Sequence, residues 1–173
     1  MGGVELQTIS SISTTGGEFS VNADVDFSMV GASVTSAGGG VEVLTRSGIV
    51  VSASTLQAGV GNVVLNGDRD NAGGGQVLME SASLVQTTTG TIDIDGEGLA
   101  GGGTQGAGVT VDASTVRAGT GRITIDGTGG PNFTGTATGV ELLGGAVEEG
   151  GGAIAITGTG DASGSDTAST NLG

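Results

Sequence analysis

A twenty-residue unit that occurs twice constrains the fold of this chain more than any other feature. Residues 48–67 read GIVVSASTLQAGVGNVVLNG and residues 108–127 read GVTVDASTVRAGTGRITIDG, and nine of the twenty positions are identical. Most of the other positions exchange one apolar or β-branched residue for another. So short a unit cannot bury its own apolar residues, and a chain that repeats it is therefore expected to stack the copies on one another.

The same spacing of apolar residues recurs along the whole chain. In each copy they fall at offsets 0, 2, 7, 14 and 16 from the first apolar residue. Six copies begin at Val4, Phe27, Ile49, Val77, Val109 and Val140. Two copies need one extra residue. In the first copy we place it before Ile12. The fourth copy is read as Val77, Met79, Leu84, Ile92 and Ile94, with the extra residue among Thr87, Thr88 and Thr89.

This spacing predicts three short strands in every copy. Apolar and polar residues alternate, as in Ile123-Thr-Ile125, which is the period of a strand with one buried face. Small residues mark a first corner, such as Ala53–Thr55, and a second corner, such as Ala58–Gly59; glycine adopts the positive φ angles of tight corners, and small side chains let corners stack. The predicted fold class is all-β: a parallel β-solenoid of about six coils with a basic rung of 22 residues.

Insertions should emerge along one edge of this β-helix. The steps between copy starts are 23, 22, 28, 32 and 31 residues, and the longer steps carry their extra residues after the third strand. The inserted loops are predicted at Asn66–Gly75, Asp95–Ala107 and Asp126–Thr138. Because a repeat tolerates insertions at one equivalent place, these loops are expected to lie side by side.

Composition agrees with one β-helical domain over residues 1–173. Glycine supplies 39 residues and only 35% are hydrophobic, which alone would also describe a disordered low-complexity tract. A disordered tract has no register, and the register favours the β-helix. Since the pattern is already running at the first residues and a seventh copy is due near Thr170–Gly173, we expect an excerpt of a longer array. No signal peptide and no transmembrane run are recognised.

The charge is strongly acidic. The net charge is −14, with 18 acidic residues, four arginines and no lysine or histidine. Such a surface repels nucleic acid and anionic lipid, so neither nucleic-acid binding nor membrane insertion is expected. It also keeps an edge-rich β protein soluble. The chain has no cysteine, so disulfides and thiolate metal sites are excluded.

Few groups are suited to catalysis. Without His, Cys, Lys, Tyr or Trp, the usual nucleophile–base pairs cannot form. Carboxylate pairs remain, and the candidates are Asp95 and Asp126, which directly follow a third strand, with Asn66 one coil earlier. The favoured interpretation of these residues is that they are the polar ends of strands leading into loops. The arginines, which β-helical polysaccharide lyases use as bases, are scattered at Arg46, Arg69, Arg117 and Arg122. No catalytic or cofactor-binding residue is assigned, and an enzyme is not expected.

Calcium and ice are two further ligands that the sequence leaves open. Oxygen ligands at close spacing occur in Asp161–Asp166, Asp68–Asn71 and Asp93–Asp95, and Glu148-Glu149 is an acidic corner. None matches a known calcium-loop spacing, so no metal residue is assigned. Threonine-rich patches at Thr87–Thr91 and Gly135–Thr138 are typical of ice-binding solenoids. The outward residue at offset 15 varies from copy to copy, which disfavours a flat ice-matching face.

One refrain carries a family resemblance. Gly139–Leu142 with Ala153–Gly160, and Gly108–Val111 with Arg122–Gly129, follow the pattern GVxL…GxIxIxGxG. This resembles the repeats of giant bacterial surface proteins, the filamentous-haemagglutinin-like adhesins. The resemblance implies export to the bacterial cell surface or the extracellular space, a right-handed parallel β-helix shaft, and a role as a stalk or adhesin.

The expected function is therefore a rigid segment of a secreted adhesin or extracellular fibre that displays stacked loops. Its expected partners are neighbouring repeats, identical chains bound end to end through unpaired strand edges, and surface glycans. A carbohydrate-binding or carbohydrate-acting β-helix is the main alternative. A self-assembling filament subunit and an ice-binding solenoid are minor ones.

Overall fold

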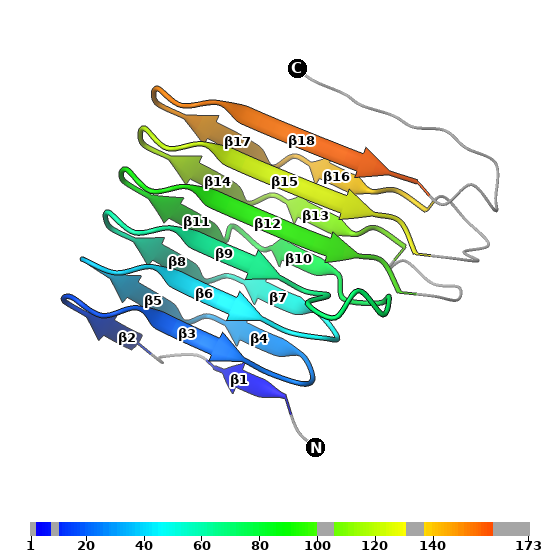
Figure 1. Ribbon diagram of the computed structural model, residues 1–173, viewed down its shortest axis with the longest axis horizontal. Coiled ribbons are helices and arrows are strands. Elements are labelled where there is room, and N and C mark those ends of the chain that lie inside the picture. Colours follow the sequence, from blue (N-terminus) through cyan, green and yellow to red (C-terminus); the bar gives the residue numbers. More distant parts are fainter. Residues whose placement is uncertain (1–2, 8–10, 100–105, 131–136, 161–173) are drawn as a thin grey trace.

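The described part of the chain is built from strands alone. The computed structural model describes residues 3–7, 11–99, 106–130 and 137–160, and these form eighteen strands in three parallel six-stranded sheets. Successive strands along the chain enter the three sheets in turn, so that every three strands complete one coil (Figure 1). The arrangement is a parallel β-helix of six coils, consistent with the right-handed winding that parallel crossovers adopt.

Each sheet takes one strand from every coil, and we name the sheets A, B and C in chain order. Sheet A contains β1 (Val4–Leu6), β4 (Phe27–Val30), β7 (Ile49–Ser52), β10 (Val77–Glu80), β13 (Val109–Asp112) and β16 (Val140–Leu143). Sheet B contains β2 (Ser11–Thr14), β5 (Ser33–Ser36), β8 (Thr55–Ala58), β11 (Leu84–Thr87), β14 (Thr115–Ala118) and β17 (Ala146–Glu149). Sheet C contains β3 (Phe19–Asn22), β6 (Val41–Leu44), β9 (Val63–Asn66), β12 (Ile92–Glu97), β15 (Ile123–Thr128) and β18 (Ile154–Thr159).

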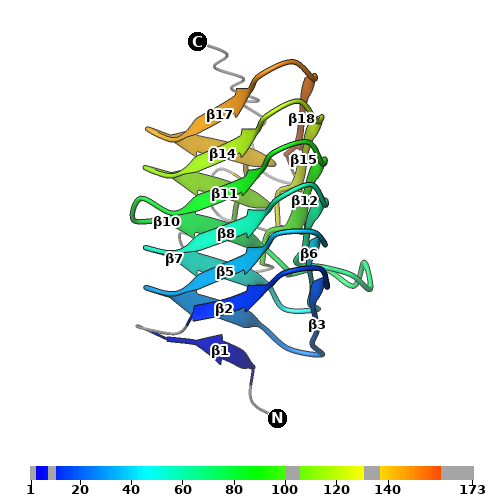
Figure 2. The same ribbon diagram turned by 90° about the vertical axis from the view of Figure 1, so that its left-hand side faces the viewer.

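The predicted stacking of aliphatic residues is confirmed. Val77 pairs with Ile49 on one side and with Val109 on the other, and Val109 pairs with Val140. Val77 and Val109 have no exposed surface, and Val140 packs against the buried cluster from the last coil. Figure 2 shows the three sheets enclosing the axis of the β-helix. The interior between them is one continuous column, mainly of Val, Ile, Leu, Met and Phe side chains. Burial of this column is the main favourable contribution to folding.

The fourth coil corrects the predicted register. Val85, and not Leu84, is the inward residue of β11: it pairs with Leu56 and Val116 and is fully buried, whereas Leu84 is half-buried on the outer face. The extra residue therefore lies at the first corner and not among Thr87–Thr89. Ser81 and Ala82 absorb it there with φ angles of 59° and 62°.

The loop boundaries also differ from the prediction. Strands β12 and β15 continue through Gly96-Glu97 and Gly127-Thr128, so the insertions begin three residues later than expected. Their placement after the third strand of the coil is confirmed. Backbone hydrogen bonds join the loop bases, from the Glu97 amide to the Gly75 carbonyl and from the Gly130 amide to the Gly106 carbonyl. The described bases of the loops thus lie side by side at one edge of the β-helix (Figure 1).

The two corners use small residues for different reasons. At the first corner one residue has positive φ in coils 2, 3, 5 and 6, at Gly31, Ala53, Ala113 and Gly144, so that alanine occupies this position as well as glycine. At the second corner the requirement is close approach: a Cβ on Gly121 would collide with the carbonyl of Gly90. Glycine is the residue that permits this approach without displacing the neighbouring coil.

A row of buried serines links successive coils at the first corner. The backbone amide of Ala32 donates to Ser54 Oγ (3.0 Å), that of Ser54 to Ser83 Oγ (3.3 Å), and that of Ser83 to Ser114 Oγ (3.1 Å). Ser54, Ser83 and Ser114 are each no more than 3% exposed. We call these three residues the serine ladder. At this corner the chain turns out of the sheets, so that its backbone amides lie outside the strand pairing. The serine hydroxyls accept the hydrogen bonds of these amides instead.

Candidate functional site

Acidic side chains gather where the strands of sheet C end and the loops begin. Asn66, Asp95 and Asp126 occupy one register position on β9, β12 and β15. Asn66 Nδ2 donates a hydrogen bond to Asp95 Oδ2 (3.3 Å). The predicted juxtaposition of Asp95, Asp126 and Asn66 is therefore confirmed. Together with Asp68 and Glu97, these residues form what we call the acidic corner.

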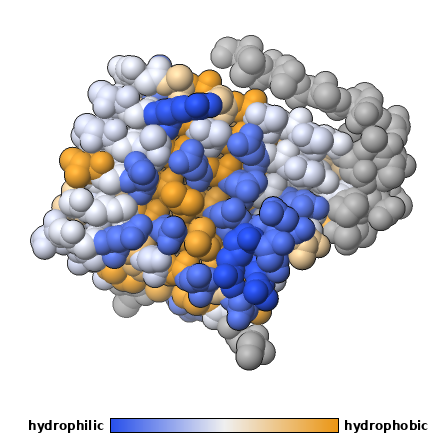
Figure 3. Space-filling view, viewed as in Figure 1, coloured by the Kyte–Doolittle hydropathy of each residue, from blue (hydrophilic) through white to orange (hydrophobic). Residues whose placement is uncertain are grey.

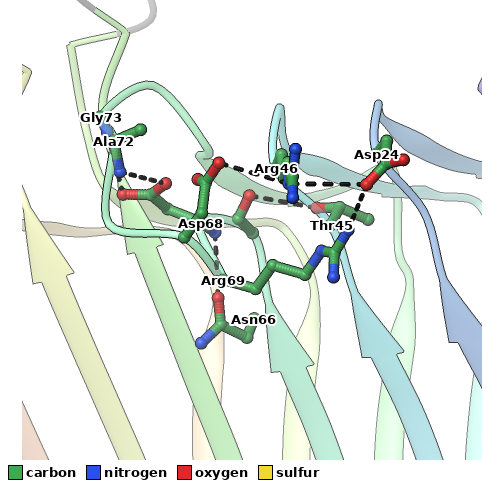
Figure 4. Close-up of polar contacts among 10 residues, drawn as sticks. Asp24, Thr45, Arg46, Asn66, Asp68, Arg69, Ala72 and Gly73 are labelled. Carbon is green, nitrogen blue, oxygen red and sulfur yellow. Dashed lines mark hydrogen bonds and ion pairs between the residues drawn. The ribbon is translucent and has the colours of Figure 1, made fainter.

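Asp68 is the buried member of the acidic corner. It is only 4% exposed, and its carboxylate accepts hydrogen bonds from the amides of Ala72 and Gly73, each 3.2 Å long (Figure 4). Its own amide donates to Asn66 Oδ1 (3.0 Å). Asp68 thereby closes the turn of the first inserted loop from inside, which explains why an acidic residue is held away from water there.

Glu97 completes the acidic corner and was not singled out by the sequence. It lies on β12 two residues after Asp95, so both side chains point to the outer face of the sheet. The sequence pattern ended the third strand at Ile94, which hid this relation. The alternation Asp93, Asp95, Glu97 continues the period of two and was the available signal.

Two carboxyl groups of the acidic corner have raised pKa values. Partial burial raises the pKa of Asp95 most, the charges of Asp126 and Asp68 add to it, and a hydrogen bond from the Gly96 backbone opposes it. The pKa of Glu97 is raised by burial first, then by a side-chain hydrogen bond with Asp68 and by the charges of Asp68 and Asp95. A hydrogen bond between two carboxyl groups needs a proton on one of them, and the acidic corner therefore holds protons more readily than free carboxylates do.

Arginines gather beside the acidic corner, contrary to the expectation that all four are scattered. Arg69 and Arg46 both pair with Asp24, the second at 3.5 Å, and Arg46 Nε also lies 3.3 Å from Asp70 Oδ2 (Figure 4). On the face formed by sheet C, a strongly hydrophilic region lies toward the edge with the loops, and a separate one lies near the top of the view (Figure 3). These pairs connect the turns that follow β3 and β6 to the first inserted loop and balance part of its negative charge.

The remaining candidates lie apart from the acidic corner. Arg117 is bound to Glu148 on the outer face of sheet B, with Nε 2.8 Å from Glu148 Oε2. Asp93 accepts a hydrogen bond from Thr91 Oγ1 (3.2 Å). Within the described ranges, no group of three or more Asp, Glu, His or Cys residues is arranged to hold a metal ion. The calcium candidate Asp161–Asp166 and the first half of the threonine patch Gly135–Thr138 lie outside the described residues.

The chemistry available at the acidic corner is proton exchange between neighbouring carboxyl groups. Asp95 and Asp126 stand on adjacent strands, whose spacing is about 4.8 Å. A carboxyl group with a raised pKa next to another carboxylate is the pairing from which acid–base catalysis of glycosidic bonds is built. Both side chains are exposed on the surface of the shaft.

Neither a membrane-spanning helix nor a known relative points to a function for the acidic corner. Among the residues that the structure describes, no helix is long and apolar enough to span a membrane. A comparison of the chain with protein-family models, with curated proteins and with solved structures finds no match.

Proposed function

We propose that this chain is a structural and interaction segment of a secreted bacterial surface protein or extracellular fibre. Its work is to form a rigid shaft and to present the inserted loops along one edge. The observation that carries the proposal is the combination of an unbroken aliphatic interior with insertions that all leave the shaft after sheet C. The resemblance of the Gly108–Val111 and Gly139–Leu142 refrains to filamentous-haemagglutinin-like repeats supports the surface location.

The shaft and the loops have separable roles in this proposal. The three sheets run through all six coils in the same order, so that the shaft does not depend on any one loop. The bare coil of 22 residues, from Phe27 to Gly48, shows that a coil closes without an insertion. Loop residues are then free to provide contacts with a partner, as in other proteins whose binding residues sit on loops over a rigid scaffold.

Loop replacement tests this division of roles. The insertions between Gly98 and Gly108 and between Gly129 and Gly139 are each replaced by the short connection that joins β6 to β7. Beads coated with the full chain or with the variant are then tested for adhesion to a panel of immobilised neutral and acidic glycans. We expect both proteins to give the same β-rich circular dichroism spectrum, and the variant to lose most of the adhesion.

The control exchanges exposed residues of the shaft. Val60→Ser alters an exposed side chain at the second corner and leaves the loops intact, so adhesion should be unchanged. Adhesion that survives loop replacement but falls with Val60→Ser would contradict the proposed display role. A full chain that adheres to none of these surfaces would contradict the adhesin proposal as a whole.

A carbohydrate-acting β-helix is the second candidate, and the paired carboxyl groups of Asp95 and Asp126 favour it. If these groups act as acid and base, the chain should release reducing ends from a polysaccharide, with Asp95→Asn and Asp126→Asn each reducing the rate about 100-fold or more. Release of new reducing ends from plant, bacterial and animal polysaccharides is the measurement. An activity that both variants retain would exclude this pair as its source.

A further inference from the structure

The two ends of the shaft are cross-sections of the hydrophobic interior. The C-terminal pole is the free edge of β16, β17 and β18, and the N-terminal pole is the free edge of β1, β2 and β3. Ile154 and Leu142 at the C-terminal pole are 43% and 36% exposed, and Val4 at the N-terminal pole is 38% exposed. The residues that pair with them in the neighbouring coils, Ile123, Val111 and Phe27, have no exposed surface. The poles are thus built like an interface between coils, and within the described part of residues 3–160 no further coil covers them.

The poles also expose strand edges. In each sheet the strands of the first and the last coil are the two outermost strands. No described strand therefore bonds to their outer edges. Unpaired backbone amides and carbonyls of this kind are a template for another parallel strand. Three edges on one pole set the position and the direction of such a strand far more strictly than a single edge would.

The two poles match each other column by column. Continuing the register of the shaft places Val4 and Leu6 over Val140 and Leu142, Ile12 over Val147, and Phe19 and Val21 over Ile154 and Ile156. Every one of these pairs is apolar, as in the interior of the shaft. We propose that the C-terminal pole binds the N-terminal pole of a second copy of this chain, so that the three sheets continue from one copy to the next.

We call the contact between the two poles the junction. One inward column of the junction is polar, and this column controls how strongly the two copies bind. Glu149 stands in the column that holds Ser36, Ala58, Thr87 and Ala118 in earlier coils, all of them buried. Its carboxylate accepts a hydrogen bond from the Gly151 amide (2.7 Å) and would face Thr14 of the next copy. An inward-pointing charge at a free edge is a known device against edge association. Glu149 therefore weakens the junction and keeps the apolar pole soluble.

The surrounding charges act in the same direction. Glu141 lies on the C-terminal pole, Glu5 and Glu18 lie in coil 1, and none of the four arginines belongs to a strand of the first or the last coil. Two acidic poles repel each other, and salt screens this repulsion over distances of about 8–10 Å. The junction should consequently become stronger as the salt concentration rises, which distinguishes it from a junction held by ion pairs.

Sedimentation of the full chain tests the proposal directly. We expect concentration-dependent growth into linear multimers, with a dissociation constant about tenfold lower at high than at low salt. Glu149→Ala should lower the dissociation constant further, by about tenfold at low salt. Val60→Asp changes an exposed apolar residue on the side of the shaft and should leave association unchanged. A full chain and a Glu149→Ala variant that both remain monomeric at millimolar concentration would overturn the proposal.

Pole variants test the head-to-tail geometry. Ile12→Asp and Val147→Asp place a charge in the same column of opposite poles. Each variant alone should be monomeric, whereas an equal mixture should form a dimer and nothing longer, because only one intact pole of each kind is present. Unchanged circular dichroism verifies that the variants fold. A mixture that stays monomeric, or that forms long multimers, would contradict head-to-tail binding.

A cross-link tests the register without altering the interior. The chain has no cysteine, so that introduced cysteines are unique. Ser20 and Ala155 belong to one outward column of sheet C. Mixed Ser20→Cys and Ala155→Cys variants should form a disulfide between chains under mild oxidation, since adjacent strands bring the two Cα atoms into disulfide range. Asn22→Cys, two residues out of register, should not react with Ala155→Cys. Equal reaction of both pairs would overturn the proposed register.

Discussion

Buried hydroxyl groups hold the first corner together, and the serine ladder shows how. Ser83 Oγ lies 2.8 Å from the Val51 carbonyl and 2.6 Å from the Glu80 carbonyl, and it also accepts the hydrogen bond from the Ser54 amide. One side chain therefore serves backbone groups of two coils. Alanine has a suitable size for the same place but satisfies none of these groups.

Removal of the Ser83 hydroxyl should consequently destabilise the chain. We expect Ser83→Ala to lower the free energy of unfolding by about 1–3 kcal/mol, because it leaves buried backbone groups without a partner. Chemical denaturation followed by circular dichroism is the measurement. Ser13→Ala, at an exposed position on β2, is the matched control and should change the free energy by less than about 0.5 kcal/mol. Equal effects of both substitutions would mean that the hydroxyl of a serine in the ladder adds no more to the free energy of unfolding than the hydroxyl of an exposed serine.

Individual residues also set the limit of what the sequence could predict. Leu84 and Val85 are both apolar, so the period of two fits either as the inward residue, and a shift by one exchanges the two faces of the strand. The sequence pattern alone could not decide between them. The register of coils 2, 3 and 5 was unambiguous because each inward aliphatic residue of their sheet B strands has polar neighbours, as Leu56 has in Thr55 and Gln57.

The strands and corners were largely predictable, and the acidic corner only in part. The alignment of Asp95 with Asp126 followed from counting along equivalent strands, which is all that parallel pairing requires. Glu97 and the contacts of Asp68 did not follow, because they depend on where β12 ends and how the inserted loop folds back. Nor could the pairs that Asp24 makes with Arg46 and Arg69 be seen, since the partners come from different coils without a fixed spacing.

Glycine is required at the second corner because one coil packs closely on the next, and not because of a property of the single residue. Gly121→Ala would place a methyl group on the Gly90 carbonyl, which belongs to the backbone of the preceding coil and cannot turn away. We expect a loss of about 2 kcal/mol or more in the free energy of unfolding, since the coils must separate to make room.

The matched control for this substitution lies in the last coil. A Cβ on Gly151 meets no other atom within 4 Å. Gly151→Ala should therefore leave the free energy of unfolding within about 0.5 kcal/mol of the original value, or raise it slightly by restricting the unfolded chain. Denaturation curves of the two variants, measured side by side, decide the point. A Gly151→Ala variant as unstable as Gly121→Ala would show that flexibility, and not close approach, is what the corner needs.

For the molecule as a whole, the acidic corner links stability to pH. The pKa values of Asp95 and Glu97 are raised in the folded state above their ordinary values of 3.8 and 4.5. The folded chain therefore binds protons more readily than the unfolded chain between the ordinary and the raised values. The free energy of unfolding should rise as the pH falls through the raised values, and should gain nothing more from these groups below the ordinary ones.

Thermal unfolding at two pH values tests this link. We expect the midpoint of unfolding to be higher at about pH 4.5, the ordinary pKa of Glu97, than at about pH 7, and the double variant Asp95→Asn, Glu97→Gln to lose part of this difference. Glu80→Gln with Asp112→Asn removes the same charge from the outer face of sheet A and should retain the difference. If both double variants lose it equally, the reduction of overall negative charge, and not the acidic corner, explains the pH dependence.

The hydrogen bonds between coils run along the axis of the shaft, and this decides how the molecule would respond to tension. A pull on its two ends would load all the hydrogen bonds between two neighbouring coils at the same moment. The number of paired residues differs between neighbouring coils: β1 and β4 share three residue pairs, whereas β12 shares six with β15, and β15 shares six with β18. Under force the first coil would therefore peel away before the coils that carry the loops, and those loops would remain presented while the shaft lengthens.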